Sequence, residues 1–170
     1  MSFNFNTKAA FDDERTIQFI RRRVPDIVFL QEFTTREQKL ILANLRDLYP
    51  HFLAPARKFG KNDVMILSRK NIIYGDQVPL KTEHSKSYHS ANHAVIILDH
   101  QHVHLLNCHF HHAFKQLSAY LAAPDSTQLY SALKASYKQQ QDEARLLADY
   151  ARTLDGPVII AGDFNDTPNS

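Results

Sequence analysis

The sequence is poor in several features that mark particular classes of protein. Its 170 residues include a single cysteine, Cys108, so no internal disulfide is expected, and the thiol is predicted to act as a small buried hydrophobic group. Only four glycines occur, and no Gly-rich loop that could cradle a nucleotide phosphate is present. The formal charge is +2 with ten neutral histidines, which excludes a polybasic arm for nucleic acid.

No hydrophobic run is long enough to cross a membrane. The longest runs, at residues 27–30, 94–98 and 158–161, fall far short of the ~20 residues that span a bilayer. The first six residues, Met-Ser-Phe-Asn-Phe-Asn, lack the basic start and apolar stretch of a signal peptide. We therefore expect no membrane segment within these residues, and the cell compartment stays open.

Length and composition predict one globular domain. A domain usually contains roughly 150 residues, and a chain with 44% hydrophobic and 22% charged residues is neither disordered nor fibrous in composition. Short β-branched runs alternate with segments of helical period, which predicts an α/β layered protein. Strands are expected at residues 3–5, 27–30, 52–54, 64–67, 94–98, 103–108 and 158–161.

Helices are expected between several of these strands. One covers residues 12–24, and a second begins after Thr34, where Glu37 completes the spacing of a capping box. The pattern from residue 114 to 154 indicates a long amphipathic helix. Residues 82–92 are interpreted as a mobile surface loop.

Polar residues follow two predicted strands, where open α/β sheets place their sites. Asp163 and Asn165 come after the strand at 158–161, although these residue types are also common in plain turns. Glu32 comes after the strand at 27–30, where a solvated or capping role is the alternative.

Two further polar positions lie within strands. Asn107 and His109 share one face of the strand at 103–108, where a hydrogen-bonded structural histidine is the alternative. Asn4 lies in the first strand, and asparagine near a chain start is commonplace. None of these residues identifies a function by itself.

Five motifs stand in the order of a known superfamily. They are Ser2-Phe3-Asn4, Leu30-Gln31-Glu32, Asn62-Asp63 with the strand running on to Arg69, Asn107-Cys108-His109 and Gly162-Asp163-Phe164-Asn165. Together they resemble the endonuclease/exonuclease/phosphatase superfamily, whose deoxyribonuclease-like fold is a four-layer α/β sandwich of two packed mixed β-sheets flanked by helices. The resemblance implies one domain over residues 1–170 with a helical insertion at about residues 114–140.

The resemblance also implies a metal site. Glu32 would be the principal ligand of a catalytic Mg²⁺, with Mn²⁺ as a substitute, and Asn4 would lie beside it at the metal and phosphate. Gln31 would support the site from behind. Oxygen ligands suit Mg²⁺, which keeps several waters and takes other oxygens from the substrate phosphate.

The same resemblance implies groups that act on the phosphate. His109 would contact the scissile phosphate, Asp163 would orient or activate the attacking water, and Asn165 would donate to a phosphoryl oxygen. The implied function is a metal-dependent phosphoesterase, a nuclease included, that hydrolyses a phosphodiester or phosphomonoester by direct attack of water. Its substrate would be nucleic acid, a phospholipid head group or a small phosphoester.

Two departures from the family pattern have consequences. The family carries an Asp-His pair beyond the Gly-Asp-Phe-Asn motif, and the sequence up to Ser170 lacks it. The last C-terminal strands are therefore expected to be missing, and residues 1–170 alone should hydrolyse poorly compared with a longer, in some relatives membrane-anchored, protein. The family also often has an arginine before the strand at 94–98, so His93 or His89 would have to replace it.

Two other functions stay open at this point. Five histidines crowd a short stretch: His102, His104, His109, His111 and His112. Among them, His109-Phe110-His111-His112 faintly resembles the zinc motif of metallo-β-lactamase-like hydrolases, although its aspartate is missing and solvated strand histidines are the alternative. The other alternative is a non-catalytic or incomplete domain of this fold that binds a partner as a scaffold, and the presence of Glu32, Asp163 and Asn165 together argues against it.

Overall fold

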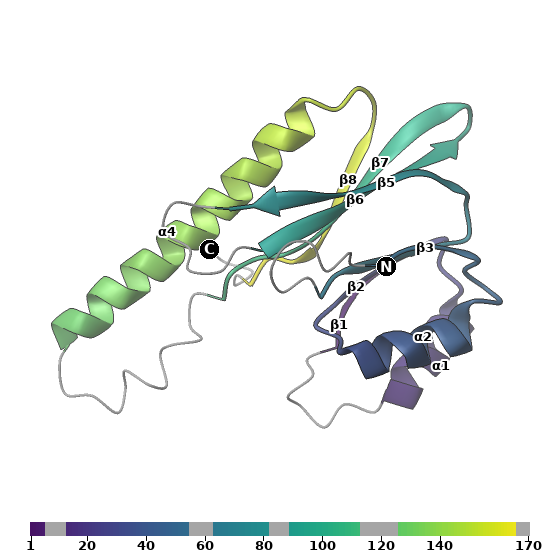
Figure 1. Cartoon of the computed structure of the whole chain (residues 1–170), viewed down its shortest axis with the longest axis horizontal. Helices are drawn as coiled ribbons and strands as arrows, with labels where there is room; N and C mark the ends of the chain where they lie inside the picture. Colours follow the sequence, from purple (N-terminus) through teal and green to yellow (C-terminus); the bar gives the residue numbers. More distant parts are fainter. Residues whose placement is uncertain (6–12, 55–62, 82–88, 113–125, 166–170) are drawn as a thin grey trace.

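The computed structural model describes residues 1–5, 13–54, 63–81, 89–112 and 126–165. They form two four-stranded β-sheets with helices on their outer sides (Figure 1). The strand order is β1-β2-β4-β3 in the first sheet and β5-β6-β7-β8 in the second. In chain order the elements are β1 (Ser2–Asn4), α1 (Asp13–Arg23), β2 (Ile27–Gln31), α2 (Thr35–Leu45), β3 (His51–Leu53), β4 (Met65–Ser68), β5 (Ile72–Leu80), β6 (His89–Leu98), β7 (Gln101–His109), α4 (Ser126–Arg152) and β8 (Val158–Asp163).

Three apolar clusters separate four layers. Side chains alternate along β2, so Val28 and Leu30 pack against α1 and α2 while Phe29 faces the second sheet and packs with Ile96. Leu147 of α4 packs on the outer face of the second sheet. Each sheet contains both parallel and antiparallel pairs. The predicted four-layer α/β sandwich is confirmed.

The chain leaves β2 through a capped helix start. The Thr34 side chain accepts a hydrogen bond from the Glu37 backbone N–H, and the Glu37 carboxylate accepts one from the Thr34 N–H. This capping box, as predicted, satisfies backbone donors that the first turn of α2 cannot pair internally. Glu32, between β2 and this cap, adopts a left-handed conformation with φ of 53°. The short connection therefore fixes the direction in which Glu32 leaves the sheet.

Two buried asparagines join the sheets. Asn107 on β7 donates through Nδ2 to the carbonyl oxygens of Leu30 (3.0 Å) and Met65 (2.8 Å) in the first sheet. Its cross-strand neighbour Asn92 donates to the carbonyl of Val64 at 2.8 Å. An unpaired buried polar group costs about 1–3 kcal/mol. These amides therefore hold the two sheets in a fixed relation close to the ends of β2 and β7.

The structure differs from the sequence prediction around β5 and β6. Ile72–Leu80 forms β5, which was not predicted because a glycine, a proline and several exposed positions break its alternation. The predicted loop at 82–92 is wrong for residues 89–92, which begin β6, while 82–88 lie outside the described residues. Ser90 and Asn92 are buried there, so a polar sequence that resembles a loop is in fact interior strand.

The long helix expected between residues 114 and 154 is present as α4. It runs along the second sheet and extends past it at its N-terminal end (Figure 1). Residues 114–125 lie outside the described part of the chain. That this region is an insertion relative to the family stays a prediction.

The single thiol is inert in this fold. Cys108 is buried beneath α4, as predicted. Burial, followed by the charge of Asp163, raises its pKa to about 12. The thiol is therefore protonated at neutral pH and takes no part in nucleophilic chemistry.

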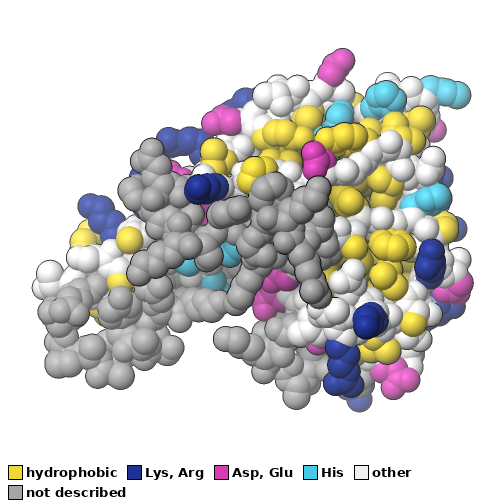
Figure 2. Space-filling model, in the orientation of Figure 1, with side chains coloured by type: hydrophobic (Ala, Val, Ile, Leu, Met, Phe, Trp, Pro, Cys, Tyr) yellow, Lys and Arg dark blue, Asp and Glu magenta, His cyan; other side chains and the backbone are white. Residues whose placement is uncertain are grey.

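β8 is one of the outer strands of the two described sheets, and it carries exposed apolar side chains. Hydrophobic side chains gather over the upper and right-hand parts of the molecule in the view of Figure 2. Ile159 and Ile160 of β8 are about half exposed. Exposed apolar edges promote association with further strands. Among the described helices, none has the length and apolar character needed to span a membrane.

Candidate metal centre and active site

Four of the predicted site residues meet at one end of the two sheets. β1 and β2 are parallel, with Asn4 opposite Gln31, so Asn4 and Glu32 leave the first sheet side by side. β7 and β8 are also parallel, with His109 opposite Asp163. β8 lies against both β1 and β2, which brings the two pairs together. Adjacent parallel strands end at the same edge, and this is where such sheets carry their sites.

The side chains of Glu32, His109 and Asp163 form what we call the centre. One possible ligand atom of each residue lies within 4.8 Å of the others. Nε2 of His109 is 3.3 Å from Oε1 of Glu32. Nδ2 of Asn4 donates to that same oxygen at 3.2 Å and also to Oδ2 of Asp163. Two carboxylates thus share one amide donor, and their like charges at this distance favour a bound cation.

Asp63 also belongs to the site, although the sequence analysis gave it no role. Its carboxylate oxygens lie 3.1 and 3.2 Å from Nδ1 of His109. Burial alone would lower the pKa of His109, but the hydrogen bond and charge of Asp63, with the charges of Glu32 and Asp163, raise it above its usual value. The sequence did contain a signal for Asp63, because this carboxylate comes directly before an apolar strand. Asp63 belongs to one of the five family motifs, but no role was assigned to it.

We expect Asp63→Asn to lower the pKa of His109, because the desolvation of the ring would then oppose a smaller attraction. A raised pKa stabilises the fold below the unfolded value of 6.5, and the effect disappears as pH rises through the folded pKa. The stability lost in Asp63→Asn should therefore be largest in mild acid and shrink toward alkaline pH. NMR titration of the His109 ring in metal-free buffer, with urea unfolding at several pH values, measures both.

The control for this experiment is Asp26→Asn, which removes a carboxylate that is well exposed and pairs with Arg69 at 3.5 Å. It should leave the His109 titration unchanged. An equal loss of stability for Asp63→Asn at all pH values, with an unshifted His109, would contradict the assigned interaction.

The Gly162–Asn165 segment is both a turn and part of the site. At Gly162, φ is 148° and a Cβ would lie 2.0 Å from the carbonyl oxygen of Cys108, so only glycine lets β8 pass this close to β7. The backbone N–H of Asn165 donates to Oδ1 of Asp163 at 2.8 Å. Its side-chain Nδ2 donates to the carbonyl of Phe110 at 2.7 Å. Donation by Asn165 to a phosphoryl oxygen stays a prediction.

Gln31 lies behind the centre. It is buried, and its Nε2 donates to Oδ1 of Asn107 at 2.8 Å and to the hydroxyl of Ser2 at 3.2 Å. Gln31 therefore connects β2 to β1 and to the opposite sheet. Any support that it gives to Glu32 passes through the backbone of β2.

The five clustered histidines do not converge on one point. Within the described residues, only His109 belongs to a group that could hold a metal ion. His104 lies on the other face of β7, where its Nδ1 is 2.9 Å from Nε2 of His93. His111 instead approaches the hydroxyl of Ser136 at 2.9 Å. The arrangement does not support a zinc site built from residues 102–112.

Of the two histidines considered as replacements for the family arginine, only His89 borders the centre. Its ring stacks on that of His109 with centroids 5.9 Å apart, and its Nδ1 is 3.2 Å from Oε1 of Glu143. His93 instead contacts the hydroxyl of Tyr150 at 2.8 Å. Glu143, a fully buried carboxylate on α4, was not predicted as part of this region.

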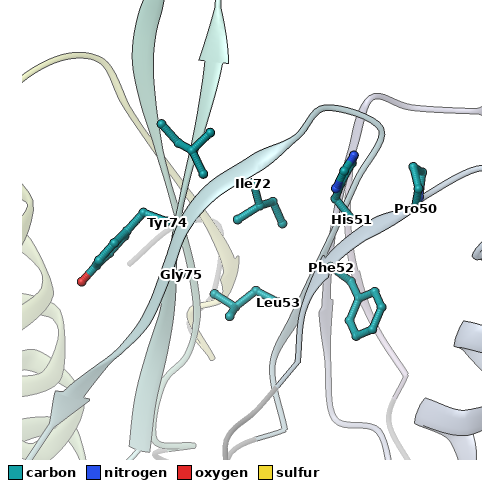
Figure 3. A pocket seen from close by; sticks show the side chains of 8 residues that line it. Pro50, His51, Phe52, Leu53, Ile72, Tyr74 and Gly75 are labelled. Carbon is teal, nitrogen blue, oxygen red and sulfur yellow. The ribbon is translucent and has the colours of Figure 1, made fainter.

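A separate hollow lies between β3 and β5 (Figure 3). Its lining residues are Pro50, His51, Phe52, Leu53, Ile72, Ile73, Tyr74 and Gly75. His51 pairs with Ser68, at the opposite end of β4 from Met65, so the hollow lies away from the centre. Its lining contains no carboxylate and only one possible metal ligand. It offers none of the chemistry found at the centre.

Comparison with known proteins gives the same assignment as the motifs. A family model described as "Endonuclease/Exonuclease/phosphatase family" matches residues 1–170. The match therefore includes every residue of the centre.

Solved structures share the fold. A D. rerio TDP2 humanized by 14 mutations is 16% identical with a TM-score of 0.69, over 99% of this chain and 66% of that one. D. rerio TDP2 complexed with single strand DNA product is 16% identical with a TM-score of 0.68, over 98% and 60%. Sphingomyelinase C from Streptomyces griseocarneus is 18% identical with a TM-score of 0.67, over 99% and 64%. The chain thus spans slightly less than two thirds of each of these structures.

Proposed function

Because this chain belongs to the endonuclease/exonuclease/phosphatase family, which includes metal-dependent nucleases and phosphatases, we propose that it contributes a divalent-metal-dependent phosphoesterase site. The observation that carries the proposal is the convergence of Glu32, His109 and Asp163 within 4.8 Å. These residues come from β2, β7 and β8, and two different sheets must meet to bring them together.

The donor set fits a hard divalent cation. Within the described residues, no ion pair joins a lysine or arginine to Glu32, Asp63 or Asp163, and the His109 ring lies between Glu32 and Asp63. Glu32 would be the principal ligand, and Asn4, which donates to the carboxylates of Glu32 and Asp163, would orient both. Carboxylate oxygens favour Mg²⁺, with Mn²⁺ as a substitute. When bound, the ion would polarise a phosphoryl oxygen.

Asp163 would orient the attacking water. The Asn165 N–H occupies one carboxylate oxygen and Asn4 the other, so both oxygens are held while lone pairs remain to accept from water. His109 is held by Asp63 through Nδ1, which leaves Nε2 directed toward the centre. An N–H at Nε2 could donate to a phosphoryl oxygen as negative charge develops there.

The charges at the centre indicate a phosphate ester as the class of substrate. A centre of this charge would recognise a phosphate ester through the metal and the His109 side chain, whatever the alcohol attached to it. D. rerio TDP2 is known with a single-strand DNA product, and another protein of this fold is a sphingomyelinase. We propose a phosphodiester or phosphomonoester of nucleic acid, of a phospholipid head group or of a small molecule.

The test is metal-dependent turnover of bis-(p-nitrophenyl) phosphate by the full-length protein. We expect hydrolysis in Mg²⁺ or Mn²⁺ and none after EDTA, with recovery on addition of either ion. A phosphomonoester assayed in parallel distinguishes the two ester classes. Abolition of turnover by a zinc-specific chelator in excess Mg²⁺ would contradict the proposed metal. Absence of turnover under all metals would favour a binding scaffold.

A further inference from the structure

The middle of α4 buries polar side chains where a helix normally buries apolar ones. Toward its C-terminal end, α4 packs Leu147 against the second sheet in the usual way. One to three turns earlier, the same helix buries Glu143, Gln140, Gln139 and Ser136. Long polar side chains are rarely buried unless they bond to something specific. The buried polar face therefore has partners that can be examined one by one.

Gln140 has its partners in the segment that carries Asp163 and Asn165. Its Nε2 donates to the carbonyl oxygen of Phe164 at 2.7 Å and to that of Asn165 at 2.9 Å. Gln140 is 6% exposed, so these bonds are shielded from water. A single amide group thus satisfies two consecutive carbonyls directly after β8.

The segment held by Gln140 contains a left-handed turn at Asn165. Asn165 has φ of 52°, a left-handed conformation that asparagine tolerates better than most non-glycine residues. In this conformation its N–H reaches Oδ1 of Asp163 and its side chain reaches Phe110. The Phe110 N–H in turn donates to the carbonyl of Asp163 at 2.9 Å. The orientation of the Asp163 carboxylate depends on these three hydrogen bonds.

Gln140 links this set of hydrogen bonds to α4. We infer that Gln140 is a positioning residue, which fixes the backbone at 164–165 and thereby aims the Asp163 carboxylate at the centre. The inference rests on the proposed function for its catalytic consequence, but its structural part stands on the contacts alone. The Gln140 amide bonds to the segment and not to the side chains of Glu32 or His109, so it acts through the segment.

Loss of the amide should affect orientation more than binding. Without Gln140, two shielded carbonyls lose their donor, and the left-handed turn at Asn165 relaxes toward commoner conformations. Small misplacement of a reacting group can lower a rate by about 10²-fold. We expect kcat to fall by roughly that factor while KM changes little, because substrate contacts are left in place.

The experiment compares Gln140→Met with Gln141→Met in the full-length protein. Methionine matches glutamine in length but cannot donate, and Gln141 is the exposed neighbour on the same helix. The first measurement is backbone amide hydrogen exchange. In Gln140→Met, the Asn165 amide should exchange at least ~10-fold faster while amides in the middle of α4 stay protected. In Gln141→Met, the Asn165 amide should exchange at the same rate as in the wild-type protein.

Gln140→Leu serves as a second variant in case Gln140→Met fails to fold, because it also removes the donor and adds no charge beside the two carbonyl oxygens. Unchanged Asn165 exchange in a folded variant would overturn the inference. Faster exchange together with reduced kcat and unchanged KM would support it in full. If the unmodified protein shows no turnover, the proposed function fails, while the exchange result still decides whether Gln140 holds the segment.

Discussion

Glu32→Gln is expected to reduce metal-dependent phosphodiester hydrolysis by roughly 10³-fold or more, because it removes the carboxylate that we assign as the principal metal ligand. Glutamine keeps the size of the side chain and can still accept from Asn4, so the fold should survive. The left-handed backbone at residue 32 is equally accessible to both residue types. The loss is therefore chemical and not a consequence of unfolding.

The measurements are initial rates at several Mg²⁺ concentrations and calorimetric titration with Mn²⁺. Glu32→Gln should weaken metal binding and resist rescue by high Mg²⁺. Glu14→Gln, which changes an exposed carboxylate on α1, is the matched control and should retain full activity. Full activity of Glu32→Gln would mean that the metal site lies elsewhere.

Local sequence patterns were sufficient for much of the fold. Thr34 and Glu37 have the spacing of a capping box, and the structure contains both of its hydrogen bonds. Residues 27–30 are apolar on both faces, and the β2 strand is indeed covered on both. The order of the five motifs then implied the sandwich, because it resembles that of a superfamily with this fold.

Local patterns failed where burial depends on distant partners. Asn92 looks like a loop residue until its bond to the carbonyl of Val64 in the other sheet is seen. Gln140 and Glu143 belong to a polar stretch that reads as the solvated face of a helix, yet both are buried against residues far away in sequence. Such contacts are set by how α4 packs on the second sheet. Helical period alone does not contain that information.

The site shows the same division. Asn4, Glu32, His109 and Asp163 were selected by resemblance, and the structure brings all four together, although their catalytic roles stay predictions. Asp63 was not predicted as the partner of His109, because its contact with Nδ1 of that ring appears only in the folded chain. The position of Asp63 before a buried strand marked it as a candidate, but its partner His109 lies 46 residues away, so no local pattern pairs the two.

Asp163→Asn should lower kcat by about 10²–10⁴-fold while KM stays nearly unchanged, because a group that orients or activates water acts mainly in the transition state. The substituted amide can still accept from the Asn165 N–H through its oxygen, so the turn after β8 should persist. Its NH₂ group would then face the amide of Asn4, where a carboxylate oxygen now accepts. The change removes both the charge and the acceptor that water needs.

Steady-state kinetics on bis-(p-nitrophenyl) phosphate separates the two constants, and circular dichroism with thermal unfolding checks the fold. Asp155→Asn, an exposed carboxylate just before the other end of β8, is the control and should behave as the unmodified protein does. A raised KM with unchanged kcat would make Asp163 a binding residue and leave the activation of water to another group. The predicted fall in kcat, with metal affinity reduced less than in Glu32→Gln, would separate the two carboxylates by role: Glu32 holds the ion and Asp163 prepares the nucleophile.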